Sequence, residues 1–420
     1  MNQPTFLLLC AYLFLVIIRP QDYTTLNLSE LPLIPVVEVL LIISALLAPK
    51  PKFRVEFFCL FFLSLWIFLS TALVNMSEAI EYSSAHLLGI SIIFYLIYQV
   101  ASKEVYVDKL LAWFVWMFFA ISWHCILQYY DPEHIGWSGK AAFMTSAGYV
   151  QPVYVGLFGD PNDMGMSLAI STPLALYLAQ KSSSRLVSLA YLIVAGTLAY
   201  TITLTNSRGS FIALMVIFAG LFYLRYGLAR SAILAFAALP IVAIFQPERM
   251  ANLVDTSSQD RVYAWYSGLR LFVENPVLGI GYEQFKIRYV RVAHNSWIEI
   301  VAELGIVGYL IWCRALFAPF LYLSATWDYI AGDKRRSWRD FNRPVGLTLA
   351  YVGALVPMFF LDRAHMITSF FIPAIALAEL QRLIDQQRVD PKRLANMSLM
   401  IPVISILALL AVYLVIQVLA

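Results

Sequence analysis

The chain contains a series of long apolar stretches, and these constrain its fold more than any other feature. A bilayer core of roughly 30 Å requires about 20 apolar residues per spanning helix, and hydrocarbon offers no partner to exposed backbone groups, so such stretches form helices. Hydrophobic residues make up 61% of the chain and charged residues 13%, against roughly 45–50% and about 25% in soluble domains. We therefore predict an all-α polytopic membrane protein with about 12–13 transmembrane helices, over residues 4–18, 31–48, 55–74, 83–101, 108–127, 161–180, 186–204, 209–224, 230–245, 296–323, 344–361, 367–384 and 398–419.

Lysine and arginine fall mainly in alternate loops between these stretches. Cytoplasmic loops of membrane proteins are enriched in both residues, and the short loops of the poorer side contain only Arg19, Lys140, Arg208 and Arg363. The N-terminus and the basic loop 325–343 are therefore predicted to be cytoplasmic. The first residues lack a basic region, so 4–18 is interpreted as a membrane helix and not as a removed signal.

Two longer segments lie on the external side, over about 128–160 and 246–295. The second contains six cations on the side expected to be poor in them, namely Arg249, Arg261, Arg270, Lys286, Arg288 and Arg291. Long loops partly escape the charge rule, so a solvated loop and an outward-facing anion site both remain open. We treat residues 1–420 as a single transmembrane domain with 246–295 as its external loop.

Several classes of site are disfavoured by the motifs that the sequence lacks. The cysteines Cys10, Cys59, Cys125 and Cys313 are scattered in apolar runs without a CxxC spacing, which argues against a disulfide framework or a zinc site. Neither a Walker lysine loop nor GxGxxG is present, which disfavours an ATP-driven pump. We expect no metal and no cofactor.

The segment 291–305 places a histidine and two glutamates at the edge of the tenth stretch. Ser296-Trp-Ile-Glu299 matches a capping box, which starts a helix at Ser296 and leaves His294 just outside it, where the positive end of the helix dipole points. Polar groups at a membrane border must be hydrogen-bonded or functional. Glu299 and Glu303 share one face, and Glu303 lies about 180° from His294 around the axis. We expect Glu303 to hold helices together and not to orient the histidine.

Two arginine motifs lie on the same external side. Arg208, in Thr205-Asn-Ser-Arg-Gly-Ser210, is either an interfacial arginine that reaches lipid headgroups or a functional residue. Arg261 belongs to a predicted amphipathic interfacial helix, in which helical spacing relates Val262, Trp265, Tyr266, Leu269, Phe272 and Val273. Arg270 lies nine residues further and projects oppositely, so only one of the two should face a given site.

Two other polar motifs have simpler structural interpretations. Asp160 and Asn162, in Gly-Asp-Pro-Asn-Asp, are typical of an Asp cap with proline at the first helical position, or they contribute to a binding site. Asp362 and Arg363 fall in a tight external loop, for which a solvated turn is the simpler interpretation.

Together these pieces resemble the O-antigen ligase and polymerase superfamily of bacterial envelope glycosyltransferases. The resemblance covers roughly residues 150–325 and is carried by Ser207-Arg208-Gly209, Asp260-Arg261 with Trp265, Asn275-Pro276 with Gly279 and Gly281, and His294-Asn295 with Glu303 and Gly305. It implies a GT-C-like multi-helix membrane glycosyltransferase fold of about twelve spans. Such proteins pass an undecaprenyl-pyrophosphate-linked glycan to an acceptor at the periplasmic face of the inner membrane, without metal or nucleotide.

The chemistry of a glycosyl pyrophosphate agrees with these residues. Arginine gives bidentate hydrogen bonds to phosphate oxygens and keeps its charge, so we assign Arg208 and Arg261 to the diphosphate. A neutral imidazole is a suitable base for the acceptor hydroxyl, so His294 is the expected base of an inverting displacement, and nearby arginines would disfavour its protonated form. Further candidates for substrate binding are Arg288, Arg291, Arg363, Asp160, Asn162 and Asn295.

The acceptor remains open at this stage. Lipid A–core, the acceptor of a ligase, is favoured because the external segments are modest in size and no large extra domain is present. A second lipid-linked glycan (a polymerase) and protein serines (an oligosaccharyltransferase) are the alternatives within the class. A lipid-linked sugar transporter would be expected to place cations deep in several spans, whereas here they cluster at one face. Membrane lipids are the other expected partners, and nothing indicates nucleic acid.

Overall fold

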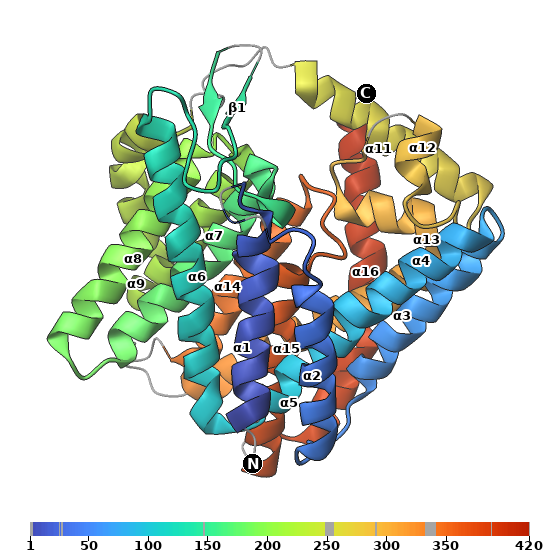
Figure 1. The fold of residues 1–420 in the computed structure, drawn as a ribbon, viewed down its shortest axis with the longest axis horizontal. Helices are drawn as coiled ribbons and strands as arrows, with labels where there is room; N and C mark the ends of the chain where they lie inside the picture. The colour runs from blue at the N-terminus through green and yellow to red at the C-terminus, as the bar shows by residue number, and fades with distance from the viewer. Residues whose placement is uncertain are drawn as a thin grey trace. The chain divides into compact units, whose positions relative to one another are not determined.

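The computed structural model describes residues 3–24, 26, 28–145, 148–247, 256–289, 292–331, 342–387 and 389–419. It is dominated by helices (Figure 1). The chain divides into two compact units, each built from three stretches of sequence. Unit 1 comprises Met1–Lys50, Gln99–Leu253 and Trp327–Pro357. Unit 2 comprises Pro51–Tyr98, Val254–Thr326 and Met358–Ala420.

Most helices lie within one unit, and the boundaries fall in α5, near the end of α13 and at the end of α14. Unit 1 contains α1 (Gln3–Ile17), η1 (Pro20–Asp22), α2 (Leu33–Leu47), α6 (Glu104–Tyr130), the antiparallel strands β1 (Phe143–Met144) and β2 (Val150–Gln151), η3 (Gly156–Phe158), α7 (Pro161–Lys181), α8 (Arg185–Leu204), α9 (Arg208–Phe245) and α14 (Arg343–Met358). Unit 2 contains α3 (Val55–Ala72), α4 (Met76–His86), the π-helix η2 (Leu87–Ile92), α5 (Ile93–Ala101), α11 (Thr256–Glu274), α12 (Gln284–Tyr289), α13 (Ser296–Ala331), α15 (Ile367–Asp385) and α16 (Pro391–Leu419).

All thirteen predicted stretches coincide with a helix or a part of one, which confirms an all-α polytopic membrane protein with a single small hairpin among the described residues. In that part of the chain, nine helices are long and apolar enough to cross a membrane. Two of the other four stretches form helices of 15 and 16 residues, α2 and α14. The stretch 230–245 continues α9 beyond a break at Gly227, where φ is 76°.

The remaining stretch is α7, a 21-residue helix that is almost wholly buried inside unit 1 and contacts α6, α8 and α9. Its hydroxyl side chains return hydrogen bonds to its own backbone, from Ser167, Ser171 and Thr172 to the carbonyls four residues earlier. Small and hydroxyl residues allow close helix packing within a membrane. A helix enclosed by other helices needs no lipid-facing surface, which explains why α7, although predicted as a stretch over 161–180, is less apolar than the nine candidate spans.

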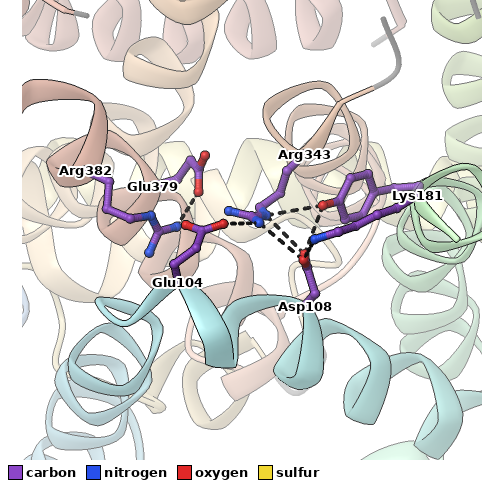
Figure 2. A network of polar contacts seen from close by, with 7 residues as sticks. Glu104, Asp108, Lys181, Arg343, Glu379 and Arg382 are labelled. Carbon is purple, nitrogen blue, oxygen red and sulfur yellow. Dashed lines mark hydrogen bonds and ion pairs between the residues drawn. The ribbon is translucent and has the colours of Figure 1, made fainter. Parts of the chain in front are cut away.

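A cluster of charged side chains joins three helix ends of unit 1 (Figure 2). The Arg343 guanidinium at the start of α14 donates to both oxygens of Asp108 on α6, at 3.1 and 3.2 Å, and also to Glu104. Lys181 at the end of α7 donates to Asp108 as well, and the Tyr177 hydroxyl donates to the same carboxylate at 2.9 Å. This charge-balanced network fixes α6, α7 and α14 at one end.

In unit 2, α13 is interrupted at Gly305, where φ is 64° and ψ is −171°. The predicted span over 296–323 coincides with a candidate membrane helix, Ser296–Leu323, and the backbone leaves the helical conformation only at this glycine. The loop 276–281 runs along the opened turn and pairs with it through three backbone hydrogen bonds, Ile280 N to Ala302 O, Gly281 N to Glu303 O, and Ile306 N to Pro276 O, at 2.9–3.0 Å.

The two backbones approach so closely that only glycine fits at two positions. A Cβ on Gly279, where φ is 73°, would lie 2.2 Å from the Glu303 carbonyl oxygen. A Cβ on Gly305 would lie 2.2 Å from the Val277 carbonyl oxygen. The glycines of the Asn275–Gly281 motif thus allow the loop backbone to contact the backbone of α13, in addition to forming a turn.

Side chains of α3 satisfy carbonyl groups freed by this break. The Trp66 indole donates to Leu304 O at 2.8 Å, and the Ser70 hydroxyl donates to Glu303 O at 3.0 Å and Leu278 O at 2.6 Å. Within a membrane, freed backbone groups are tolerated where neighbouring helices bind them. The other end of α3 lies near the end of α15, where Lys52 pairs with Asp385 at 2.6 Å. Glu379 and Arg382 of α15 form a further ion pair (Figure 2).

Candidate functional site

His294 lies in the connection between α12 and α13 of unit 2. The preceding Ala293 is fully buried, and its carbonyl accepts a hydrogen bond from the Trp265 indole of α11 at 3.0 Å. His294 itself has φ of 50°, a left-handed conformation that non-glycine residues rarely adopt. Its side chain is 41% exposed. The backbone is therefore held by α11 while the imidazole remains partly exposed.

A carboxylate faces this imidazole from the loop between α14 and α15. Asp362 Oδ2 lies 4.0 Å from His294 Nδ1, and Asp362 Oδ1 accepts the backbone N–H of Asn295 at 2.9 Å. Burial raises the pKa of Asp362, although hydrogen bonds from the backbone of His294 and Asn295 and the charge of Arg363 oppose this. The side chain is only 5% exposed, so the interpretation of this loop as a solvated turn is wrong.

The start of α13 differs from the predicted capping box. The cap is Asn295, whose side-chain oxygen accepts the N–H groups two and three positions later, at 3.0 and 3.2 Å. Ser296 is the first helical residue, and its hydroxyl donates to Leu361 O at 2.6 Å and accepts Arg363 N–H at 3.0 Å. The serine thus holds the Asp362 loop against the helix start, which leaves capping to the asparagine.

Asn295 and Arg363, two of the predicted substrate-binding residues, both lie beside His294 in this arrangement. Asn295 is fully buried, and its side-chain Nδ2 has no hydrogen-bond partner among the described residues. The Arg363 guanidinium donates to the carbonyl of Asp362 at 2.6 Å. A structural role of Asn295 is therefore established, and its contact with substrate stays a prediction.

The two glutamates of α13 occupy different places. Glu303 is 2% exposed, and its carboxylate accepts the backbone N–H of Phe285 at 3.0 Å. It thereby anchors the start of α12 to α13. Glu299, one turn closer to the cap, is near enough to Asp362 and Arg363 to interact with both electrostatically. The contact of Glu303 joins α12 to α13, and the expectation that Glu303 does not orient His294 stays a prediction.

The loop between α14 and α15 also carries a histidine, His365, which is enclosed where His294 is exposed. Its ring packs edge-on against His86 and Tyr282, with centroids 4.9 Å apart in each pair. Burial, and then the proximity of His86, hold the pKa of His365 well below its usual value. Both of its ring nitrogens are buried. His365 is thus a neutral packing residue, whereas His294 is accessible.

The two arginines of α11 differ as their spacing predicts. Arg270 points to solvent and pairs with Glu274 at 3.0 Å, with side chains 73% and 50% exposed. Arg261 is half-buried. The helix packs through Trp265 and Gly268, where a Cβ would lie 2.3 Å from the Ile298 side chain of α13. The predicted amphipathic helix is therefore present, with only Arg261 on the more enclosed side.

Unit 1 contains the other predicted group of polar residues, at the starts of α7 and α9. Asp160 caps α7 by accepting Asn162 N–H at 2.7 Å, with Pro161 in the first turn, which confirms the predicted cap. Arg208 is the first residue of α9, half-buried after the cap residue Ser207. The Ser210 hydroxyl donates to the Asn162 carbonyl at 3.4 Å, so Arg208, Asp160 and Asn162 share one end of unit 1.

Two predicted substrate-binding arginines remain, of which one is exposed and one lies outside the described residues. Arg288 is exposed on the short helix α12. Arg291 lies outside the described residues, as does part of the external loop 246–295. Asp362 is the site residue that sequence reasoning missed. The available signal was an aspartate next to an arginine in a short loop between two apolar stretches. Nothing in the sequence pairs this aspartate with a histidine 68 positions earlier.

Among the residues that the structure describes, no group of three or more His, Cys, Asp or Glu side chains could hold a metal ion. Residues 193–313 match the family model described as O-antigen ligase. The match includes Arg208, Arg261, His294 and Glu303, ends before Asp362, and confirms the resemblance to the O-antigen ligase superfamily. It supports a function within the O-antigen ligase and polymerase family. No curated protein matches the chain.

Proposed function

We propose that this multi-pass membrane protein, whose residues 193–313 match the O-antigen ligase family, is a ligase-type glycosyltransferase. It transfers a glycan from undecaprenyl pyrophosphate to lipid A–core at the periplasmic face of the inner membrane. The observation that carries the proposal is the accessible His294 imidazole on a fixed backbone, backed by the buried carboxylate of Asp362. The reaction requires neither metal nor nucleotide, because pyrophosphate is already a good leaving group.

The acceptor hydroxyl attacks C1 of the donor sugar while the bond from C1 to the pyrophosphate oxygen breaks. His294 accepts the proton of that hydroxyl, so the new glycosidic bond forms without a free alkoxide. The negative charge of Asp362 stabilises the imidazolium that results and restrains the ring through its Nδ1 side. Direct displacement inverts the anomeric centre. Undecaprenyl pyrophosphate leaves with the electron pair of the broken bond, and the proton passes from His294 to solvent.

Arg261 and Arg208 are the proposed partners of the departing diphosphate. Its charge grows as the C1–O bond breaks, and guanidinium groups stabilise developing charge through paired hydrogen bonds. Arg261 is supplied by the helix whose Trp265 also holds the backbone before His294. Arg208 is supplied by the start of α9, where the free N–H groups of a helix N-terminus favour anions. Arg363, next to Asp362, is a further candidate.

The test is transfer by the purified full chain in lipid nanodiscs. The donor is an undecaprenyl-pyrophosphate-linked glycan, the acceptors are lipid A–core or a second molecule of the lipid-linked glycan, and chelator is present without nucleotide. We expect glycosylated lipid A–core, with no product from a His294→Gln control. Elongated lipid-linked chains instead would assign polymerase activity and reject the ligase proposal. A strict requirement for metal or nucleotide would reject the mechanism.

A further inference from the structure

An apolar groove of about 640 Å³ runs along α1 and α6 in unit 1. Its walls include Phe6, Cys10 and Phe14 from α1 and Trp113 and Trp116 from α6. The volume falls within the roughly 300–1,000 Å³ of small-molecule sites. Phe14 and Trp116 are 36% and 42% exposed. Because both helices are candidate membrane spans, an exposed apolar groove along them has the chemistry to take an acyl chain.

The two helices run in the same direction, so the groove has a defined polar end. Phe6 stacks on Tyr106 with centroids 4.7 Å apart, and two turns later Phe14 approaches Trp113 at 6.2 Å. Lys109 lies toward the end at which both helices begin, and it is the single charged residue among those that line the groove. Its ammonium lies 5.9 Å from the centre of the Tyr106 ring.

The carboxylates nearest in sequence to Lys109 are already neutralised. Asp108 and Glu104 point into the cluster with Arg343 and Lys181 (Figure 2). That cluster balances two negative charges with two positive ones. For Lys109 itself, no ion pair is found within the part of the chain that the structure describes. A lysine at the polar end of an apolar groove therefore contributes a positive charge that no described carboxylate neutralises.

We propose that this groove binds one anionic glycerophospholipid of the cytoplasmic leaflet, with an acyl chain along α1 and α6 and the phosphate at Lys109. Basic residues at the end of an apolar surface between membrane helices attract anionic headgroups. Indole and phenyl side chains line the depth that the chain would occupy. The lipid is distinct from the glycan donor, because the N-terminal end of α1 is predicted to be cytoplasmic and the donor diphosphate is external.

Native mass spectrometry of the detergent-solubilised full chain tests the proposal with two probes, phosphatidylglycerol and phosphatidylcholine of identical acyl chains. The wild type should retain phosphatidylglycerol preferentially. Lys109→Gln should lower this preference about fivefold, because a lysine near an anionic surface contributes about 1 kcal/mol. Lys103→Gln removes an exposed lysine one residue before α6 and outside the groove. It is the matched control and should leave the preference unchanged.

A second variant tests the groove separately from the charge. Ala112→Phe places a ring in the groove and should lower the occupancy of both lipids, with thermal unfolding measured to show that the variant is folded. An unchanged lipid preference in Lys109→Gln would overturn the proposal. Equal losses in Lys109→Gln and Lys103→Gln would overturn it as well, because diffuse surface charge and not a site would then select the lipid.

Discussion

The carboxylate of Asp362 bridges the imidazole of His294 and the start of α13. One oxygen lies 4.0 Å from His294 Nδ1, and the other accepts the N–H of Asn295 at 2.9 Å. A single buried side chain thereby lies beside both an accessible ring and a helix N-terminus. Ser296 holds Asp362 in this place, because its hydroxyl contacts the residues on both sides of Asp362.

Replacement of Asp362 by asparagine should separate these two tasks. Asparagine keeps an oxygen that can accept the Asn295 N–H but removes the charge that faces His294. We expect transfer to fall about 10- to 100-fold, less than on loss of the base itself, while the protein remains inserted and folded. Turnover and thermal unfolding of Asp362→Asn, measured in the same nanodiscs, check this. Wild-type turnover would show that the carboxylate has no part in the reaction.

The same variant should change how stability depends on pH. Burial raises the pKa of Asp362, so the native protein holds this proton at a pH where the unfolded chain has lost it. The contribution of Asp362 to stability is therefore greatest in acid and decreases as pH rises above about 3.9, the usual aspartate value. Relative to Asp362→Asn, the wild type should lose stability between acid and neutral pH. A constant difference in thermal unfolding across that range would contradict the sign.

Replacement of His294 tests the base directly. His294→Gln keeps a polar side chain of similar size, so a satisfied interfacial histidine would tolerate it. A base cannot be replaced in this way, and the expected loss is about 10²–10⁴-fold. Donor binding should persist, because the 41% exposed side chain packs little. Near-wild-type transfer by His294→Gln would show that His294 is not the base, and the arginines would be the remaining proposed catalytic residues.

The arginines of α11 provide an internal comparison. Arg261→Lys keeps the charge but loses the planar pair of donors, so we expect a large loss of transfer in a folded protein. Arg270→Lys is the control, because Arg270 is exposed and pairs with Glu274 on the same helix. Arg208→Lys, on α9, should behave like Arg261→Lys. Equal losses in all three variants would mean that the exposure of an arginine does not decide whether it takes part, and full activity in all three would mean that positive charge alone suffices.

The close contact between Gly279 and the break in α13 should make the folded protein sensitive to substitution at Gly279. Gly279→Ala combines a φ of 73° with a Cβ 2.2 Å from the Glu303 carbonyl oxygen, and we expect about 2–5 kcal/mol of destabilisation. Gly196→Ala, in α8, meets nothing within 4 Å and should be neutral or slightly stabilising in a helix. Thermal unfolding in detergent compares the two. Equal melting temperatures would show that the backbone pairing of loop 276–281 is dispensable.

The sequence by itself determined the membrane class and the helices, because thirteen apolar stretches leave hydrogen-bonded helices as their only stable form in hydrocarbon. It also determined the capped start of α7 at Asp160 and the helix that carries Arg261, because both depend on contacts between near neighbours. It also indicated α7 as the stretch 161–180, although a helix enclosed by protein need not be strongly apolar.

Only the tertiary structure decided how distant residues meet. The helix cap is Asn295 and not the predicted serine, because the Ser296 hydroxyl forms hydrogen bonds with residues more than 60 positions away. The tertiary structure interrupted α13 at Gly305, because a loop from 276–281 competes for its backbone groups. It also paired Asp362 with His294. Such contacts depend on the packing of α13 against the loop before α15. The local spacing of apolar and polar residues does not specify which distant segments pack together.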